Sequence, residues 1–498
     1  MNPVNYVQLL QLALPQTIVV ATALIVMATD LLLLRDRATR TRFTIAAVLA
    51  SLGCAAAIVR ILLAPAQANI LDGTLIANPL IHLVQIALLA LTIFALLISA
   101  ESTFTDNVGE FVLLILLATA GMMFLVASQD LLVIFISLEL LSLSLYTLAA
   151  FNKRSLQSWE AAIKYYLFGG MSAAFLLFGF SLLYGFSNST SLPGIASAIH
   201  GPNLNPFVAV AIVTTAIGLG FKVAAAPFHF WAPDVYQGAP APTAAFIASG
   251  SKIASFFVFF QLVVIGFAGA EGAAAIPHFV RGWIPVLALM AAASMLLGNL
   301  VAIRQTSLRR LLAYSAIAHA GYMLLAIVAH TQSSLAALLY YVVTYALATL
   351  GAFAVISVVE AQKGSDQLIH FDGLSRQAPV LSFCLAIFIL SLAGIPPLAG
   401  FFGKFYLFAT VLASTPRTAD LVWLVVLAIA MSAVSLYYYL RVLKAMYVAA
   451  PAAHAKEFHS PILSQVLVGV LAAAVILLGC APELLLKPIL AAIEASGL

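Results

Sequence analysis

Four charged side chains lie inside long apolar stretches of the sequence: Glu139, Lys222, Lys252 and Lys404. Each charge costs roughly 2.5 to 3.5 kcal/mol at the centre of a lipid bilayer, so residues of this kind usually mark function. Opposite charges about 5 Å apart, at an effective dielectric constant near 20, attract each other by roughly 3 kcal/mol. Making or breaking such a pair changes the proton affinity of its neighbours, and we expect these four residues to carry protons.

We expect Glu139 to set the proton affinity of Lys222, and separation of that pair to release a proton toward Lys252. His229 and His319 are candidate relays, because imidazole titrates near neutrality and has two usable nitrogens. The alternative for each histidine is a hydrogen-bonded core residue. The alternative for the charged residues is a buried set that only fixes helix packing. Hydroxyl groups that could hold water between the ionisable groups belong to Ser142, Ser144, Tyr146 and Tyr314.

The composition is that of a multi-pass membrane protein. Of the 498 residues, 64% are hydrophobic and 8% are charged, and the mean hydropathy is +1.11. A soluble domain has about 25% charged residues. No basic domain or stripe is present, which argues against nucleic-acid binding. Cys54, Cys384 and Cys480 are far apart and form no CxxC pair, so we expect no metal or iron–sulfur site on this chain.

Apolar segments of about 20 residues predict an all-α fold with about fourteen transmembrane helices. Two of these helices are interrupted by proline, which removes a backbone donor and clashes with the preceding turn. Pro227 and Pro233 are expected to break the seventh helix after Lys222, and Pro396 and Pro397 to break the twelfth. Non-helical backbone at membrane depth is tolerated only where it faces protein or water, so both breaks should line an internal hydrated cavity. Asp234 is expected to cap or brace the second half of the seventh helix.

The charges of the loops predict the orientation. Lys and Arg concentrate in alternate connections, around residues 35–42, 152–164, 304–310, 362–376 and 441–456. Cytoplasmic loops carry the excess of Lys and Arg in membrane proteins. With an even number of spans, both termini are therefore expected on the non-cytoplasmic side.

The interrupted helices hold matching places, each fourth in a set of five, and the two helices run in opposite directions. This placement is typical of inverted repeats with a binding site near the middle of the membrane. We therefore divide the chain into four parts. They are residues 1–105 with helices 1 to 3, 106–270 with the first repeat (helices 4 to 8), 271–450 with the second repeat (helices 9 to 13), and 451–498 with helix 14.

Three stretches carry a family resemblance: GFKVAAAPFHFWAPDVYQGAPAPTAAF, LRRLLAYSAIAHAGYM and GIPPLAGFFGKFYLF. They resemble the antiporter-like subunits of respiratory complex I, most closely the N-type, also called subunit 2. The resemblance covers essentially the whole chain and implies fourteen transmembrane helices in two inverted five-helix repeats. It matches Glu139 to the family's acid on the fifth helix. It matches the lysines on the seventh, eighth and twelfth helices to Lys222, Lys252 and Lys404.

The resemblance implies a subunit of the membrane arm of the translocase NADH:quinone oxidoreductase, in which quinone reduction elsewhere drives proton translocation through this chain. FMN, iron–sulfur clusters and quinone would then belong to partner subunits, with no cofactor on this chain. The implied partners are other membrane-arm subunits, including a neighbouring antiporter-like subunit and small membrane subunits. The expected location is the bacterial inner membrane, with an organelle inner membrane or thylakoid membrane as the alternative. The functional alternative is a subunit of a multisubunit Na+/H+ antiporter.

Overall fold

The structure is a computed structural model that describes residues 6–64, 67–70, 73–199, 204–275, 279–414, 418–450, 458 and 460–497. In this part of the chain, twelve helices are long and apolar enough to cross a membrane. Three shorter apolar helices, Pro206–Lys222, Pro379–Ala393 and Ala399–Ala413, belong to the two interrupted spans. The long helices and the two interrupted spans together give the predicted number of fourteen, and the all-α prediction is confirmed.

The helices are α1 (Tyr6–Leu12), α2 (Leu14–Leu33), α3 (Thr39–Leu62), α4 (Pro79–Ser99), α5 (Val108–Val126), α6 (Leu131–Ala149), α7 (Leu156–Ser187), α8 (Leu192–Ala198), α9 (Pro206–Lys222), α10 (Trp231–Gly238), α11 (Ala241–Ala248), α12 (Gly250–Gln261), α13 (Trp283–Ala302), α14 (Leu308–Ala329), α15 (Gln332–Lys363), α16 (Leu374–Gln377), α17 (Pro379–Ala393), α18 (Ala399–Ala413), α19 (Thr418–Tyr447), α20 (Ile462–Cys480) and α21 (Glu483–Ser496). A π-helical turn, η1 (Leu262–Gly266), continues α12, and a 3-10 turn, η2 (Leu368–Phe371), precedes α16. The strands pair as two small antiparallel hairpins, β1 (Ala68–Ile70) with β2 (Leu75–Ala77), and β3 (Ala273–Ala274) with β4 (Phe279–Val280).

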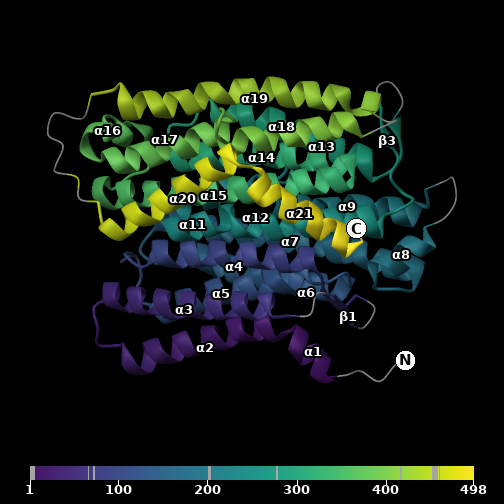
Figure 1. Cartoon of the computed structure of the whole chain (residues 1–498), viewed down its shortest axis with the longest axis horizontal. Coiled ribbons are helices and arrows are strands. Elements are labelled where there is room, and N and C mark those ends of the chain that lie inside the picture. Colours follow the sequence, from purple (N-terminus) through teal and green to yellow (C-terminus); the bar gives the residue numbers. More distant parts are fainter. Residues whose placement is uncertain are drawn as a thin grey trace.

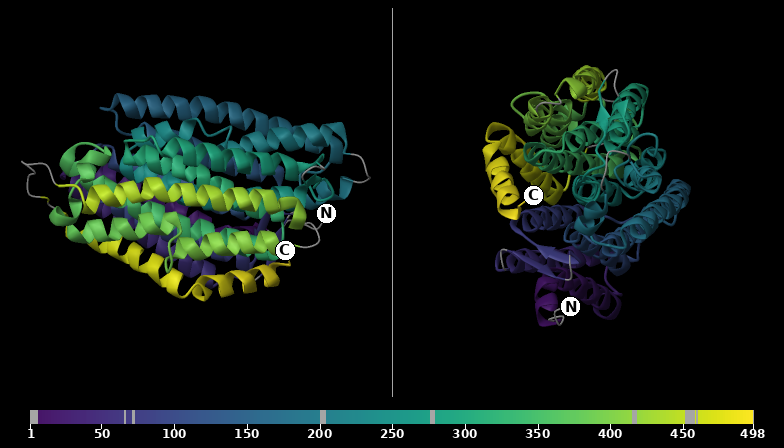
Figure 2. Two further views of the ribbon diagram at one scale, coloured as in Figure 1. Left: turned by 90° about the horizontal axis from the view of Figure 1, so that it is seen from above. Right: turned by 90° about the vertical axis from the view of Figure 1, so that its right-hand side faces the viewer.

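The long helices run side by side, with α2 at one edge of the molecule and α19 at the other (Figure 1). The end-on view in Figure 2 shows the N-terminal helices as a bundle beside the larger group that follows. We call the end that carries the connections after α2, α6, α13 and α15 the basic side. The opposite end carries both hairpins and is called the hairpin side. In Figure 1 the hairpins lie at the right.

The seventh span is interrupted where proline predicts it. Helix α9 ends at Lys222 and α10 begins at Trp231, with Pro227 in the segment between them. The indole Nε1 of Trp231 donates to the carbonyl oxygen of Phe221 at 2.9 Å, which joins the two halves. The expectation for Pro233 was wrong, because this residue lies in the first turn of α10. A backbone N–H has no intrahelical partner there, so proline is tolerated.

The twelfth span is interrupted in the same way. Helix α17 ends at Ala393 and α18 begins at Ala399, so Pro396 and Pro397 lie in the break, as predicted. Gly394 follows α17 with φ of 86°, a left-handed conformation that favours glycine. A Cβ atom on Gly400 would lie 1.9 Å from the Ser391 carbonyl oxygen, so the two helix ends approach each other more closely than any other residue type allows.

Two short backbone bridges occupy equivalent places in the two halves of the chain. Asp130, the N-cap of α6, pairs with Ser191, and Ser307, the N-cap of α14, pairs with Gln367. In each case the first residue of the capped helix donates to the loop before the interrupted span, with N···O distances of 2.8 and 2.9 Å. The first bridge lies on the hairpin side and the second on the basic side. This is the arrangement expected of an inverted pair.

Several elements were not predicted: the two hairpins, α8, α21, and a break between α11 and α12 at Ser249. Helix α21 packs against α4 and α15. The side chain of Gln67 donates to the carbonyl oxygen of Ala495 at 2.7 Å, and the backbone N–H of Leu80 donates to the Ser496 hydroxyl at 3.4 Å. Helix α21 therefore fastens the N-terminal bundle to the second half of the chain.

Candidate functional site: a buried line of ionisable groups

Lys222 is the last residue of α9 and lies directly before the break. Its Nζ donates a hydrogen bond to the Ser142 hydroxyl of α6 and lies 5.5 Å from the ring centroid of Tyr146. A cation at the C-terminal end of a helix is favoured by the helix dipole. The break therefore positions the ammonium group, and the predicted polar residue Ser142 is its direct partner.

Glu139 is the ninth residue of α6 and is half-buried. It lies on the side of α6 that also carries the exposed residues Ile136 and Leu143, one turn before and after it. It forms no direct ion pair with any residue of the described chain, although its charge is within electrostatic range of Lys222. The acid therefore lies close to the surface of the subunit, one turn of α6 before Ser142, the partner of Lys222.

Lys252 is the third residue of α12, just after the irregular backbone at Ser249. Its side chain is among the largest that are fully enclosed, with 2% of the residue exposed. The Nζ donates to the Ala316 carbonyl oxygen of α14 at 2.9 Å and lies 5.5 Å from the ring centroid of Tyr345 on α15. No carboxylate forms an ion pair with it in the described residues. A carbonyl oxygen and an aromatic face therefore stabilise this ammonium group.

His319 is held by two tyrosine hydroxyls. Its Nδ1 is 2.6 Å from the Tyr341 hydroxyl, and its Nε2 is 3.1 Å from the Tyr439 hydroxyl. Tyr439 also shares a hydrogen bond with the Ser315 hydroxyl at 2.5 Å. Neutral imidazole has one donor and one acceptor nitrogen, so one tyrosine must donate to the ring and the other must accept from it. A change of tautomer at His319 would exchange these roles.

Lys404 lies on α18, with 5% of the residue exposed. Its Nζ donates to the carbonyl oxygens of Leu392 and Ala393 and to the Ser432 hydroxyl, each at 3.0 Å. The two carbonyls are the last of α17, where the helix leaves acceptors without intrahelical partners. A lysine thus lies at each break. Lys404, from the helix after its break, binds the carbonyl oxygens that the break leaves free, whereas Lys222, at the end of the helix before its break, binds Ser142 of α6.

One face of α14 connects Lys252 with Lys404. Ala316, whose carbonyl accepts from Lys252, is followed at three-residue spacing by His319 and Tyr322. The Nζ of Lys404 lies 5.3 Å from the ring centroid of Tyr322, and the His319 and Tyr322 rings are 5.7 Å apart. The structure therefore brings Lys252, His319 and Lys404 together in one line. Lys222 and Ser142 lie at the first break, and among the described residues no contact joins them to this line.

His229 is not joined to this line. It lies between α9 and α10, and its ring stacks on Phe230 with centroids 4.6 Å apart. Its Nδ1 is buried and has no hydrogen-bond partner among the described residues. Asp234 braces α10, as expected, through ion pairs with Lys164 at 2.7 Å and Arg310 at 2.6 Å.

The tyrosines around His319 were missed from sequence. With the structure known, a pattern in the sequence can be related to them. Tyr340 and Tyr341 are adjacent, Tyr438 and Tyr439 are adjacent, and Tyr345 lies one turn after Tyr341. Aromatic residues in an apolar helix are common as packing, so the pattern alone selects none of them. In the described part of the chain, no three His, Cys, Asp or Glu side chains gather as a metal site would require.

We expect Tyr341→Phe to reduce proton translocation about tenfold, because it removes a hydroxyl from His319 and keeps the ring; positioned proton-transfer groups contribute about 10²- to 10⁴-fold. The measurement is acidification of membrane vesicles that contain the native assembly of this chain. Tyr340→Phe is the matched control, because it also removes one buried hydroxyl, from a hydrogen bond of 2.7 Å to Leu478. Equal effects of the two variants would contradict a special role for Tyr341.

An all-helical bundle with two interrupted helices and enclosed lysines defines a class of protein, the ion-translocating membrane subunits. Residues 128–435, more than half of the chain, match the family model described as NADH:quinone oxidoreductase/Mrp antiporter, TM. The chain is 54% identical over 497 residues to NADH-quinone oxidoreductase subunit N 2 of Acidobacterium capsulatum, covering 98% of this chain and 99% of that one. The chain belongs to the subunit N family of NADH-quinone oxidoreductases.

Further relatives agree with this placement. NAD(P)H-quinone oxidoreductase subunit 2 of Trichodesmium erythraeum is 40% identical over 446 residues, covering 88% of this chain and 81% of that one. A chain of respiratory complex I from Thermus thermophilus has 33% identity and a TM-score of 0.78, covering 95% of this chain and 98% of that one. A chain of the Mrp complex from Dietzia sp. has the same fold, with a TM-score of 0.79 at 19% identity over 97% of each chain.

Proposed function

We propose that this chain carries protons across the membrane as a membrane-arm subunit of NADH:quinone oxidoreductase, driven by quinone reduction elsewhere in the complex. The observation that carries the proposal is the enclosed line of Lys252, His319 and Lys404, together with the position of Lys222 at the other helix break. Lysine ammonium groups that contact carbonyl oxygens, hydroxyls and aromatic rings, without a carboxylate, depend on these neighbours to stabilise their charge. Such groups can take up and release protons as their surroundings change.

Glu139 acts in this proposal as the control charge for Lys222. Its half-buried place beside Ile136 and Leu143 supports a neighbouring antiporter-like subunit packed against this face of α6. A charge change in that neighbour would then reach Lys222 through Glu139 and Ser142. We assign no relay role to His229, because no described contact joins it to the line, and we retain His319 as the relay.

We propose that flavin, iron–sulfur clusters and quinone are bound by partner subunits. The three cysteines support this assignment, since Cys54 and Cys384 are separate and buried and Cys480 stands alone and exposed. The basic loops at one end support a bacterial inner-membrane protein with both termini on the non-cytoplasmic side. The two matched bridges support the division into repeats at residues 106–270 and 271–450, flanked by 1–105 and 451–498.

The second candidate, a subunit of a multisubunit Na+/H+ antiporter, is favoured by the shared fold of the Dietzia protein. A native gel of gently solubilised membranes, stained for NADH oxidation, separates the two functions. We expect this chain in a large band that oxidises NADH. Migration in a smaller assembly without that activity, together with cation-driven proton exchange in vesicles, would replace the complex I assignment.

A further inference from the structure

Aromatic rings lie close to the ammonium group of Lys222. The Nζ atom is 5.5 Å from the ring centroid of Tyr146 on α6 and 5.7 Å from that of Phe221, the preceding residue. Both distances are within the range of about 6 Å in which an aromatic face attracts a cation. Among the described residues, no carboxylate forms an ion pair with this lysine. The place of the Tyr146 ring therefore decides much of the electrostatic surroundings of this charge.

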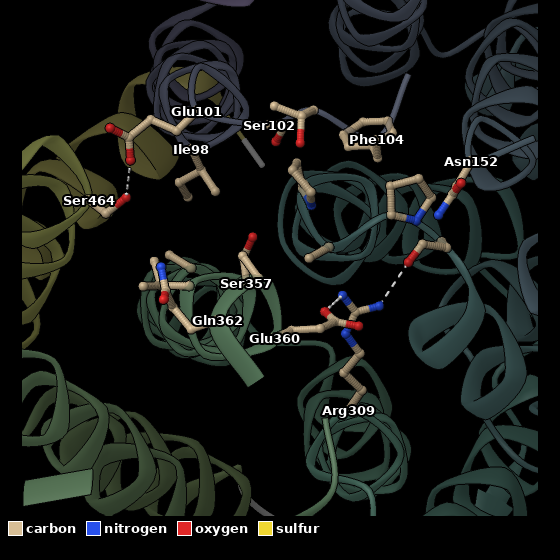
Figure 3. Close-up of a pocket in the computed structure, with 18 of the residues that line it drawn as sticks. Ile98, Glu101, Ser102, Phe104, Asn152, Arg309, Ser357, Glu360, Gln362 and Ser464 are labelled. Atoms are coloured by element: carbon tan, nitrogen blue, oxygen red, sulfur yellow. Dashed lines mark hydrogen bonds and ion pairs between the residues drawn. The ribbon is translucent and has the colours of Figure 1, made fainter. Parts of the chain in front are cut away.

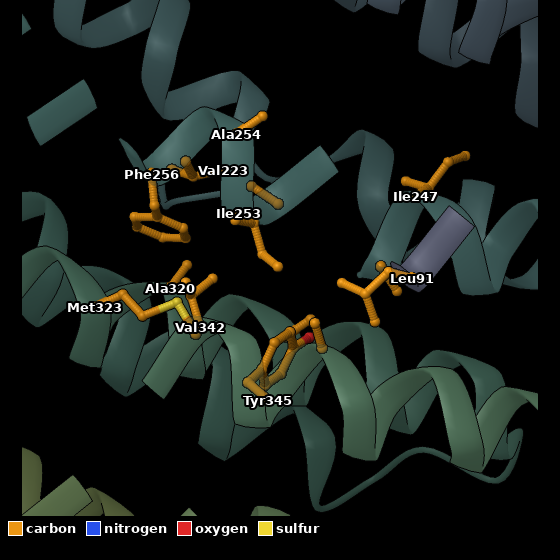
Figure 4. Close-up of a cluster of buried hydrophobic side chains, with 14 of the residues drawn as sticks. Leu91, Val223, Ile247, Ile253, Ala254, Phe256, Ala320, Met323, Val342 and Tyr345 are labelled. Carbon is orange, nitrogen blue, oxygen red and sulfur yellow. The ribbon is translucent and has the colours of Figure 1, made fainter. Parts of the chain in front are cut away.

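The other side of this break is apolar. Val223, the residue after Lys222, has no exposed surface and belongs to the hydrophobic core. Figure 4 draws Val223 in the same apolar cluster as Phe256 and Ile253 of α12. The described polar and aromatic neighbours of the ammonium group therefore come from α6 and from Phe221, and not from α12.

A glycine of α7 leaves the space that the Tyr146 side chain occupies. A Cβ atom on Gly169 would lie 1.9 Å from the hydroxyl oxygen of Tyr146 and 2.4 Å from its Cζ atom. A Cβ atom on the next residue, Gly170, would have nothing within 4 Å. Glycine weakens a helix relative to alanine, and at position 169 the close approach of the tyrosine offsets that cost. With any larger residue at this position, Tyr146 would have to move.

Tyr165 supports the same ring. It lies one turn before Gly169 on α7, is 2% exposed, and meets the Tyr146 ring edge-on, with centroids 4.7 Å apart. The Tyr165 ring also stacks on Trp231, the first residue of α10, with centroids 4.4 Å apart and 10° between the planes. Edge-on and stacked pairs of this kind are favoured arrangements of aromatic rings. Tyr165 thus connects the ring beside Lys222 with the second half of the seventh span.

Helix α10 is fastened to α7 at more than this one place. The ammonium group of Lys164, next to Tyr165, pairs with Asp234 at 2.7 Å. A Cβ atom on Gly238 would lie 2.4 Å from the carbonyl oxygen of Gln157, so the two helices also approach each other closely at the end of α10. Helix α7 therefore holds both the Tyr146 ring and the second half of the interrupted span.

The end of α10 is also fixed to α14, beside a cavity of about 360 Å³ on the basic side (Figure 3). Arg309 of α14 is 3% exposed and donates to the carbonyl oxygens of Gln237 at 3.0 Å and Ala239 at 2.8 Å. It also pairs with Glu360 of α15. Helix α10 is thus held at both ends, by Trp231 at the break and by Arg309 at the basic side.

We propose that Gly169 and Tyr165 are positioning residues for Lys222: they hold the Tyr146 ring against its ammonium group, and Tyr165 ties that ring to α10 through Trp231. Neither residue contacts the ammonium group in the described structure, and both act through Tyr146. The inference rests on the proposed function for its purpose, the control of a lysine that carries protons. The placement of the Tyr146 ring is a property of the fold and can be tested by itself.

The first test compares Gly169→Ala with Gly170→Ala in electron cryomicroscopy maps of the native assembly. Both variants add one methyl group to the same helix, the first against Tyr146 and the second in open space. In the Gly169→Ala map we expect the Tyr146 ring centroid to move beyond the range of about 6 Å from the Lys222 Nζ. In the Gly170→Ala map it should keep its native distance. A Tyr146 ring that stays in place in the Gly169→Ala map would overturn the proposal.

Tyr165→Leu tests the same placement without adding an atom, and it decides the question if Gly169→Ala does not assemble. Loss of the ring should release Tyr146 from its edge-on contact and Trp231 from its stack, so both rings should shift in the map. Tyr165→Phe keeps the ring and should leave both in place. Native positions of Tyr146 and Trp231 in the Tyr165→Leu map would contradict the role of Tyr165.

The second test is acidification of membrane vesicles that contain the native assembly of this chain. Gly169→Ala and Tyr165→Leu should each lower proton translocation about threefold or more, because the ammonium group loses an aromatic face. Gly170→Ala and Tyr165→Phe should translocate at the native rate. Phe180→Leu is the control for loss of a buried ring from α7, since Phe180 is 4% exposed and lies farther along the same helix. An equal loss in Phe180→Leu or in Tyr165→Phe would contradict the proposal.

The two tests together separate this inference from the proposed function. A displaced Tyr146 ring with native translocation overturns the positioning role if Lys222→Met is inactive. The same result overturns the proposed function instead if Lys222→Met also translocates at the native rate.

Discussion

Lys222→Met in the intact complex is expected to abolish most proton translocation, with at least a tenfold loss, while the complex still assembles. Methionine is close to lysine in length and apolar, and it removes a charge whose insertion costs roughly 2.5 to 3.5 kcal/mol. The fold should therefore be unchanged or slightly stabilised. What is lost is the group that donates to Ser142 and responds to Glu139. The measurement is vesicle acidification per NADH oxidised, with the amount of complex determined on a native gel.

Lys153→Met is the control for charge removal, since Lys153 lies exposed in the connection before α7. It should translocate protons at the native rate. Native translocation by Lys222→Met would reject the proposed role and leave a packing role for the buried charges. Loss of assembly in Lys222→Met alone would equally favour the packing role, because it would show that the fold depends on this charge.

Asp30→Ala is expected to be the most destabilising single change in the N-terminal bundle. Asp30 is 1% exposed and pairs with Arg42 through two hydrogen bonds of 2.8 and 2.6 Å. Its carboxylate also accepts from the backbone N–H of Gly109 at 2.9 Å, at the N-terminus of α5. Removing one partner of a buried ion pair costs about 3 to 5 kcal/mol, because the other charge stays buried. The midpoint temperature for loss of the assembled complex should fall clearly.

Two further variants separate this explanation from a general sensitivity of the region. Asp36→Ala removes an exposed acid from the loop after α2 and should leave the midpoint unchanged. The double variant Asp30→Leu with Arg42→Met should recover part of the loss, since an apolar pair of similar volume can replace a buried ion pair, while the N–H of Gly109 stays without its acceptor. An Asp30→Ala complex as stable as the native one would show that solvent reaches Arg42 in the assembly.

The sequence located the two breaks and the buried lysines because both signals are local. A proline interrupts its own helix, as at Pro227 and Pro396, and a lysine in an apolar stretch is conspicuous by itself. The contacts between these residues could not be predicted in the same way. Helix α14 is enclosed on all sides, so its apolar pattern does not reveal that Ala316, His319 and Tyr322 form one working face.

Asp30 shows a different limit of prediction from sequence. It stands at the end of a span, beside the basic connection at residues 35–42, so it resembles an ordinary loop acid. Its burial depends on Arg42 in the next helix and on Gly109, 79 residues later in the chain. The same holds for Tyr341 and Tyr439, whose shared partner His319 is contributed by a third helix. Residues whose burial or role depends on partners far away in the sequence cannot be identified from the local sequence pattern.

The position of α21 has a consequence for how the two parts of the chain hold together. Residues 483–496 include the partners of Gln67 and Leu80, which lie 428 and 416 residues away from those partners in the sequence. Without α21, every ionisable group of the proposed proton line would remain, and this link to the N-terminal bundle would be lost. The position of the N-terminal helices relative to the second half of the chain is therefore expected to depend on α21 and not on the ionisable residues.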